Sequence, residues 1–140
     1  TSTGTVTDFN LDGGLQDLTA ASAKIKAALE ADPTIDAIFA LNADIAAKAA
    51  LPAAQELGRD LFIGTVDMSE DALNAIAAGD MEFAIDQQQY AQGYLSVVLL
   101  YLNVTNAHSL GGGLPMYTGP GFVDASNVEA VIGLVAAGTR

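Results

Sequence analysis

Short apolar segments alternate with longer amphipathic segments along this chain, and this alternation restricts the fold more than any other feature. Apolar stretches rich in β-branched and aromatic residues indicate strands, whereas apolar residues at a three- to four-residue spacing indicate helices. The strands predicted in this way span 4–9, 35–40, 61–66 and 81–86. The predicted helices span 15–31, 42–58, 69–79, 89–106 and 126–137. This order predicts right-handed crossovers and a three-layer α/β fold, in which helices cover both faces of a doubly wound parallel sheet.

Local signals mark several of the predicted helix ends. Ser69 is a typical N-cap residue, and Gly79 suits the left-handed position that follows a helix. Gly58 has the same role at the end of the second predicted helix. Pro52 lies inside that helix, and we expect a kink there because its ring displaces one backbone hydrogen bond.

Composition limits the partners and the cellular setting. The 140 residues, 51% of them hydrophobic, suit one domain with a core of its own. With 5 Lys and Arg against 17 Asp and Glu, the net charge is −12, so we expect no nucleic-acid or anionic-membrane partner. Cysteine is absent, and the longest apolar run, "VVLLYL", is too short to span a membrane. The opening "TSTGTVT" begins almost inside a predicted strand, so we expect a mature or truncated chain.

Polar side chains follow each of the four predicted strands. They occupy 8–12, 42–44, 67–68 and 86–89, and three of the four groups include an amide. The carboxyl ends of parallel strands meet at one edge of a sheet, and ligands of open α/β sheets bind beyond that edge. The sequence therefore predicts a polar, ligand-binding edge.

Two segments carry a family resemblance. "IDAIFALNADIAAKAA" and "LFIGTVDMSEDALNAIAAGDMEFAIDQQQYAQGYLSVVLL" resemble the carboxyl-terminal lobe of type I periplasmic solute-binding proteins, the sugar-binding components of ABC importers, such as ribose- and galactose-binding proteins. In that lobe one strand ends in Asn, one in Gly-x-x-Asp, and one in Gln before a long helix. The resemblance runs from about Gly4 to Asn127. It implies that Asn42, Asp67 and Gln87 bind the hydroxyls of a sugar or polyol.

The resemblance also implies partners and a location. The ligand is held between two lobes, the protein delivers it to the membrane permease of an ABC transporter, and the location is periplasmic or, in a single-membrane bacterium, extracytoplasmic and membrane-associated. The sequence departs from the family pattern in two ways. Only one lobe is present, without its first strand and helix. Ala43 also stands where the family often has Asp, with an acid at Asp44 instead. The amino-terminal lobe is thus expected to be a missing partner. The resemblance does not specify the sugar.

These departures predict a fragment with two parts. Residues 1–110 form the carboxyl-terminal lobe, and 111–140 form a crossover segment and terminal helix directed toward the missing lobe. Apolar residues of the second part are then expected to face that lobe; they are Phe122, Val128, Val131, Ile132, Leu134 and Val135. We therefore expect the isolated chain to self-associate.

Residue chemistry agrees with sugar binding but leaves alternatives open. An ionised Asp accepts hydrogen bonds from hydroxyls, and Asn and Gln each donate and accept. Asp67 and Asn42 can instead cap the helices that follow them. Tyr90 can stack on a sugar ring, although a position in the helix core is favoured. Gln87 has no comparable structural explanation, because no turn or cap rule favours Gln at its position.

A metal site is the next alternative. "DFNLDGG" resembles the start of a calcium-binding loop, with oxygens from Asp8, Asn10 and Asp12. Its twelfth position is Thr19, which cannot supply the bidentate carboxylate of such loops. We therefore predict a turn before a helix, with no metal and no cofactor.

Catalysis is not predicted either. His108 is the only histidine and lies in a Ser/Gly loop away from the polar edge. A glycosidase pair drawn from Asp44, Asp67 and Asp86 would need one buried, protonated acid, of which the sequence gives no sign. We therefore predict a receptor and not an enzyme. The alternatives are the effector-binding domain of a LacI-type repressor, which shares this lobe, and an unrelated enzyme of flavodoxin-like shape.

Overall fold

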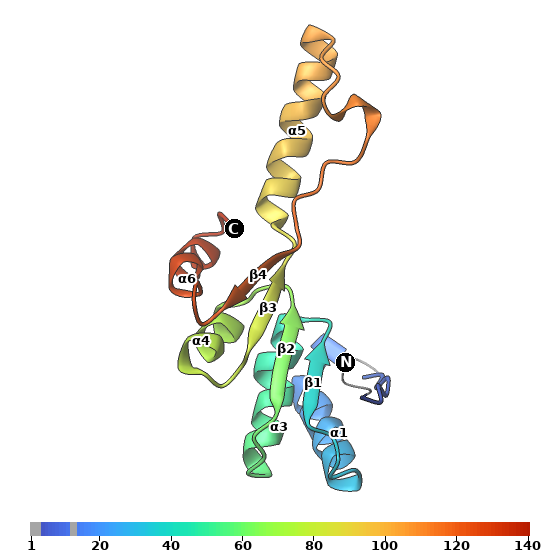
Figure 1. Cartoon of the computed structure of the whole chain (residues 1–140), viewed down its shortest axis with the longest axis vertical. Helices are drawn as coiled ribbons and strands as arrows, with labels where there is room; N and C mark the ends of the chain where they lie inside the picture. Colours follow the sequence, from blue (N-terminus) through green and yellow to red (C-terminus); the bar gives the residue numbers. More distant parts are fainter. Residues whose placement is uncertain (1–3, 12–13) are drawn as a thin grey trace.

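A mainly parallel sheet of four strands organises the computed structural model, which describes residues 4–11 and 14–140. The strands are β1 (Ala37–Ala40), β2 (Phe62–Val66), β3 (Phe83–Asp86) and β4 (Gly121–Asp124), and they lie in this order across the sheet (Figure 1). β1, β2 and β3 are parallel, and β4 runs antiparallel to β3. The predicted α/β class is confirmed.

Helices connect the strands at the expected places. They are α1 (Leu18–Ala31), α2 (Ala43–Ile45), α3 (Leu51–Glu56), α4 (Glu70–Ala78), α5 (Gln89–Asn106) and α6 (Glu129–Ala136), with short 3-10 helices at Gly14–Gln16 and Gly111–Gly113. The Ser69 hydroxyl caps α4 by accepting a hydrogen bond from the Ala72 N–H at 3.3 Å. Gly79 ends α4 at φ 82°, and Gly58 follows α3 at φ 62°. The predicted caps are therefore confirmed.

Pro52 produces a different irregularity from the expected kink. A π-helical turn at Ala46–Ala50 joins α2 to α3, and Pro52 lies in the first turn of α3. In a π turn the backbone hydrogen bonds span one residue more than in an α-helix. This shift accommodates Pro52, which has no backbone N–H to donate. Ala46, Ala49 and Ala50 in this turn are fully buried, so small side chains let it pack closely against its neighbours.

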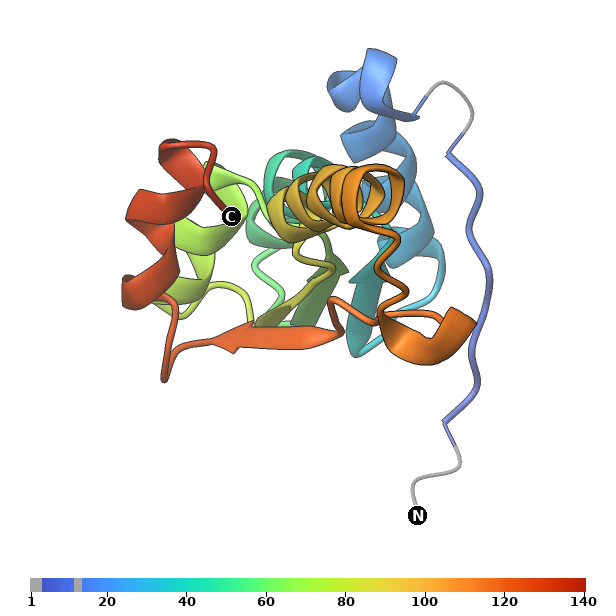
Figure 2. The ribbon, with the colours of Figure 1, turned by 90° about the horizontal axis from the view of Figure 1, so that it is seen from above.

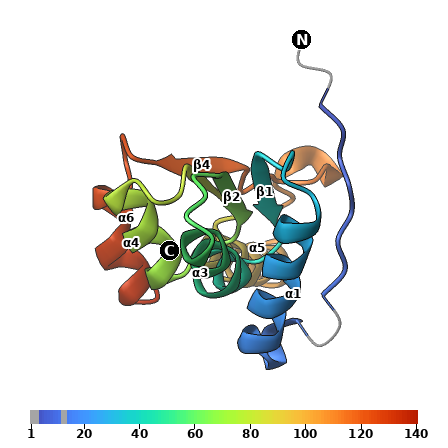
Figure 3. The same ribbon diagram turned by 90° about the horizontal axis from the view of Figure 1, so that it is seen from below.

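The core lies between the sheet and the helices on one side of it. Its largest fully buried apolar side chains are Ile63, Leu73, Ile76, Val123 and Val128. α1, α3, α4 and α6 all lie on this side (Figures 2 and 3). Burial of these apolar side chains is the main source of the stability of the lobe.

The opposite side of the sheet carries a row of four aromatic rings, here termed the phenylalanine face and made of Phe39, Phe62, Phe83 and Phe122. The Phe83 ring lies 5.8–6.1 Å from the other three ring centroids. Phe39, Phe62 and Phe122 are 50–59% exposed. In the described part of the chain no helix covers this face.

The strand predicted over 4–9 is wrong. Residues 4–10 pair with no strand of the sheet, and Val6 is 89% exposed. This segment runs as an extended trace at a distance from β1 (Figure 2). Alternating β-branched residues favour a strand only when a neighbouring strand supplies hydrogen-bond partners, and β1 pairs with β2 alone.

The segment after residue 120 also differs from the expectation. β4 was not predicted, and its Val123 is 1% exposed. α6 packs on α4, and Val128 and Val131 are buried in the core of this chain. The expectation that Val128 and Val131 face another lobe is therefore wrong. Phe122 and Leu134 do remain exposed, at 59% and 45%.

A helical arm, residues 89–118, projects from the sheet (Figure 1). α5 forms its outgoing half and contains no buried residue, and the chain returns along α5 to β4. The exposed apolar side chains of the arm include Tyr94, Val97, Leu100, Tyr101, Val104, Leu114 and Tyr117. Among the described residues, no helix is long and apolar enough to cross a membrane.

Candidate ligand-binding site

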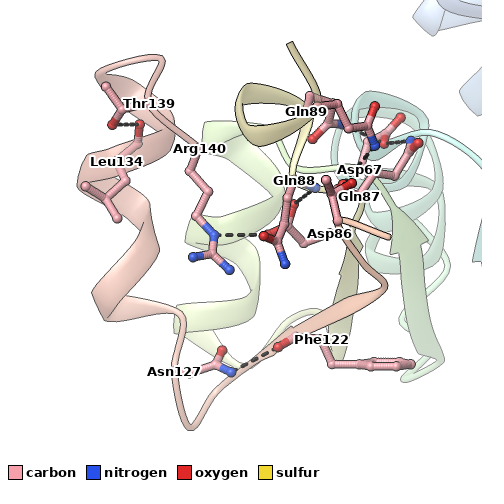
Figure 4. Close-up of polar contacts among 12 residues, drawn as sticks. Asp67, Asp86, Gln87, Gln88, Gln89, Phe122, Asn127, Leu134, Thr139 and Arg140 are labelled. Carbon is pink, nitrogen blue, oxygen red and sulfur yellow. Dashed lines mark hydrogen bonds and ion pairs between the residues drawn. The ribbon is translucent and has the colours of Figure 1, made fainter. Parts of the chain in front are cut away.

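Asp67 follows β2 at the carboxyl edge of the sheet in an unusual backbone conformation. Its φ is 69°, and its N–H donates to the Ile85 carbonyl at 2.9 Å, which ties it to β3. A left-handed conformation costs a non-glycine residue about 1–2 kcal/mol, and such conformations concentrate at functional sites. The conformation places the Asp67 carboxylate beside the strand-to-helix corner after β3, where the glutamines lie (Figure 4).

Two glutamine side chains converge on this carboxylate. Gln87 and Gln89 both donate their Nε2 groups to Asp67 Oδ1, and the Gln89 distance is 2.8 Å (Figure 4). The structure thus brings together Asp67 and Gln87, two of the three predicted site residues. Gln89 belongs to the polar group predicted over 86–89, but the family pattern did not single it out.

The same geometry determines what the site offers to a ligand. Asp67 Oδ1 takes both amide donors, whereas Asp67 Oδ2 accepts no hydrogen bond from the described residues. Each Nε2 uses one of its two N–H groups for Asp67, so Gln87 and Gln89 each keep one N–H donor and a side-chain carbonyl oxygen that accepts. The edge therefore offers both acceptors, one of them charged, and amide donors.

Asn42, the third predicted site residue, caps a helix. Its Oδ1 accepts from the Asp44 N–H at 2.9 Å and the Ile45 N–H at 3.2 Å. The register pairs Ala40 with Thr65, so Asn42 and Asp67 follow adjacent strand ends. The structure does not join Asn42 to the Asp67–Gln87 pair by a hydrogen bond, but it places Asn42 at the same edge.

Asp44 and Lys48 form a charge network beside the edge. Lys48 Nζ lies 3.1 Å from Asp44 Oδ1 and 3.0 Å from Asp71 Oδ2. Hydrogen bonds with Asp71 and then with Asp44 raise the pKa of Lys48. Asp44 is therefore already paired with a cation on its own helical segment, unlike Asp67.

A groove adjoins Gln87 on the side of the arm. It encloses about 420 Å³ between α5 and the returning chain, and its lining includes Gln87, Leu95, Leu99, Met116 and Tyr117. The backbone carbonyl of Gln87 accepts from Gln92 Nε2 at 2.8 Å and from Thr118 Oγ1 at 3.0 Å, which holds the two halves of the arm together at its base. Gln87 therefore stands between the polar edge and an apolar groove.

Among the described residues, no group of three His, Cys, Asp or Glu side chains could hold a metal. Asp12 and Gly13 of the calcium-like loop lie outside the described residues. His108 follows the end of α5, where its carbonyl accepts from Asn103 Nδ2 at 2.9 Å. Tyr90 stacks on Tyr94, with ring centroids 6.1 Å apart.

A carboxylate and two amides are in contact at the carboxyl ends of a mainly parallel sheet, which is the edge where open α/β sheets bind ligands. Residues 4–107 match the family described as periplasmic binding protein domain, and the chain belongs to this family. The predicted resemblance is therefore confirmed. No match is found among curated proteins.

Solved structures agree with this family. A carbohydrate transporter from Acidothermus cellulolyticus, crystallised in complex with myo-inositol, is 40% identical, with a TM-score of 0.79 over 89% of this chain and 43% of that one. An arabinose binding protein from Geobacillus stearothermophilus is 24% identical, with a TM-score of 0.69 over 84% of this chain and 42% of that one. The chain thus spans about two fifths of the length of these proteins.

A third similar structure is an ABC transporter periplasmic solute binding protein from Actinobacillus succinogenes with bound D-allose. It is 22% identical, with a TM-score of 0.69 over 84% of this chain and 40% of that one. At this identity, as for the arabinose binding protein, the likeness shows the fold alone.

Proposed function

We propose that this chain is the carboxyl-terminal lobe of the solute-binding protein of an ABC importer and that its ligand is a monosaccharide or a cyclic polyol. The observation that carries the proposal is the convergence of Gln87 and Gln89 on Asp67 at the ligand-binding edge of the sheet. The 40% identity to a carbohydrate transporter crystallised with myo-inositol supports a polyhydroxylated ring as the ligand.

The chemistry of the edge favours hydroxyl donors. Vicinal hydroxyls can donate to Asp67 Oδ2 and to the side-chain carbonyl oxygens of Gln87 and Gln89. The amide nitrogen of the Asn42 side chain can donate to a ligand oxygen. A hydrogen bond to an ionised group contributes about 1.5–3 kcal/mol. The Asp67 carboxylate and the net charge of −12 both repel anions, so a neutral sugar or polyol fits better than a sugar phosphate.

The ligand is proposed to be held between this lobe and a second one. We assign the arm, residues 89–118, to contact with that lobe, because its apolar side chains are exposed and it leaves the sheet beside the site. Under this assignment the chain leaves the lobe at the turn of Gln87 and Gln88, and not at residue 110 as the sequence predicted. β4 and α6, which follow the arm, then belong to this lobe. The phenylalanine face is proposed to be covered by further secondary structure of this lobe, because parallel sheets are buried on both faces.

The family implies an extracytoplasmic location. We propose that the protein is periplasmic, or tethered to the membrane surface in a single-membrane bacterium, and that it delivers its ligand to a membrane permease. The 40% identity to a carbohydrate transporter supports this function over that of a transcriptional repressor.

The test is ligand binding by the complete natural protein. Calorimetry and thermal shift are measured with myo-inositol, D-allose and arabinose, and with inositol phosphate as an anionic control. We expect at least one neutral ligand to bind and to raise the melting temperature, since a ligand that binds only the folded state stabilises it. Asp67→Asn should weaken that binding. If no neutral sugar or polyol binds, or if Asp67→Asn leaves the affinity unchanged, the proposed function is wrong.

A further inference from the structure

Asp86, the last residue of β3, is a carboxylate buried beneath the candidate site. It is 0% exposed, and among the described residues it is the one charged side chain in the core. Its two oxygens have separate partners: Oδ1 accepts from the Gln88 N–H at 2.6 Å, and Oδ2 accepts from Arg140 Nε at 2.9 Å (Figure 4). A buried carboxylate is tolerated when it is paired and hydrogen-bonded in this way.

The bond from Oδ1 shapes the corner that carries the site. Gln88 has φ 59° and ψ 55°, a left-handed conformation, and it precedes α5 without a side-chain cap of its own. The Asp86 side chain stabilises this turn by binding the N–H two residues ahead, as Asx turns do. Gln87 and Gln89 lie on either side of Gln88, and both reach Asp67 from this one turn.

The bond from Oδ2 connects the corner to the far end of the chain. Arg140 lies 54 positions after Asp86 and follows α6, which packs on α4. Without the guanidinium, the buried carboxylate loses its charged partner and has to leave its position or gain water. Each of these outcomes removes or reorients the acceptor that the Gln88 N–H uses.

We propose that Asp86 and Arg140 are positioning residues for the ligand site. Their ion pair holds the turn in which Gln87 and Gln89 both reach Asp67, although neither residue touches the ligand. The inference rests on the proposed function, because it assigns these residues to the same sugar or polyol site. The ligand affinity then depends on a side chain that follows α6 and lies outside the site.

The experiment uses the complete natural protein with Arg140→Met, Arg140→Lys and Asp86→Asn. Lys26→Met is the matched control, because it removes a 2.8 Å ion pair with Glu56 that lies away from the site. Affinity for myo-inositol, melting temperature and the side-chain amide resonances of Gln87 and Gln89 are measured for each. The resonances are assigned from Gln→Ala variants.

We expect Arg140→Met to weaken myo-inositol binding by about tenfold, the lower end of the loss that follows removal of groups that orient metal ligands. Arg140→Lys should recover part of the affinity, because it retains a cation. The amide resonances of Gln87 and Gln89 should shift in Arg140→Met and Asp86→Asn but not in Lys26→Met. A purely structural role would lower the melting temperature of Arg140→Met while leaving the affinity and both resonances unchanged, and this result would overturn the proposal.

Failure of the proposed function is distinguishable from failure of this inference. If the natural protein binds no myo-inositol, the amide resonances still report the geometry of the corner. Shifted resonances in Arg140→Met would then support positioning by the ion pair, and unshifted ones would contradict it. If Asp86→Asn does not fold, the two Arg140 variants carry the test.

Discussion

Gln89 donates to Asp67 Oδ1 at 2.8 Å across 22 positions of the chain, so the first turn of α5 contacts the end of β2. Gln87 donates to the same oxygen. The carboxylate is thereby oriented before any ligand arrives, and an ordered binding group costs less conformational entropy when it binds. The second oxygen, Oδ2, accepts no hydrogen bond from the described residues and is therefore available to a ligand.

Asp67→Ala should weaken ligand binding more than Tyr90→Phe does. Asp67→Ala removes the charged acceptor and releases both glutamine amides, so we expect a loss of about 1.5–3 kcal/mol of binding free energy for each ligand hydrogen bond lost. Tyr90→Phe is the control, because Tyr90 stacks on Tyr94 in α5 and keeps its ring in this variant. Calorimetry with the cognate sugar or polyol measures both. Equal and small losses would remove Asp67 from the site.

Gly64→Ala should destabilise the sheet because Gly64 lies under the Phe83 ring. A Cβ atom at this position would come within 2.6 Å of two ring carbons of Phe83. Overpacking of this kind costs about 1–3 kcal/mol, and combining it with Phe83→Leu should recover part of the loss. Gly133→Ala is the matched control, since nothing lies within 4 Å of that position in α6, and it should be neutral or stabilising. Urea unfolding of the parent protein, Gly64→Ala, Phe83→Leu and the double variant measures the coupling; additive effects would contradict the contact.

Ser126 should control the acidity of Asp124 at the turn after β4. The Ser126 hydroxyl and then its N–H donate to Asp124 Oδ1, at 2.5 and 2.8 Å, and lower the pKa of Asp124. A depressed pKa stabilises the folded state above the unfolded-state pKa, and this contribution disappears as the pH falls through the folded-state pKa. Ser126→Ala should therefore raise the pKa of Asp124 and reduce stability at neutral pH more than in acid.

Carbon-13 NMR titration of the carboxyl groups measures this shift. The Asp32 carboxyl, whose pKa is lowered by Thr34, serves as the internal control, because Ser126→Ala leaves its partners intact. An unchanged Asp124 titration in Ser126→Ala would show that the hydroxyl does not determine the pKa.

The 140-residue chain on its own should self-associate. Three of the four rings of the phenylalanine face are at least half exposed, and α5 buries no residue. Exposed apolar surface of this kind favours association between copies. Light scattering of the purified chain should show oligomers, and Phe39→Ser with Phe122→Ser should reduce them. Val6→Ser is the control, because Val6 is 89% exposed and belongs to no strand of the sheet. A monodisperse monomer at high concentration would contradict the prediction.

Part of the candidate site could be read from the residues and part could not. Asp67 and Gln87 follow strand ends, and the carboxyl ends of parallel strands meet at one edge, so their proximity was predictable. The role of Gln89 was not, because three consecutive glutamines look alike until a turn directs each side chain. The left-handed Gln88 between them sends both neighbours toward Asp67.

Features that depend on neighbours in the chain were determined by the sequence itself. The Ser69 cap and the left-handed Gly79 use groups within a few residues of each other, so local chemistry is enough to specify them. Features that depend on distant partners were decided by the tertiary structure. Residues 4–9 have a strand pattern and no pairing strand, whereas the four residues of β4 form a strand because β3 lies beside them. The Asp86–Arg140 pair spans 54 positions, and no local rule specifies an ion pair that exists only after α6 has packed on α4.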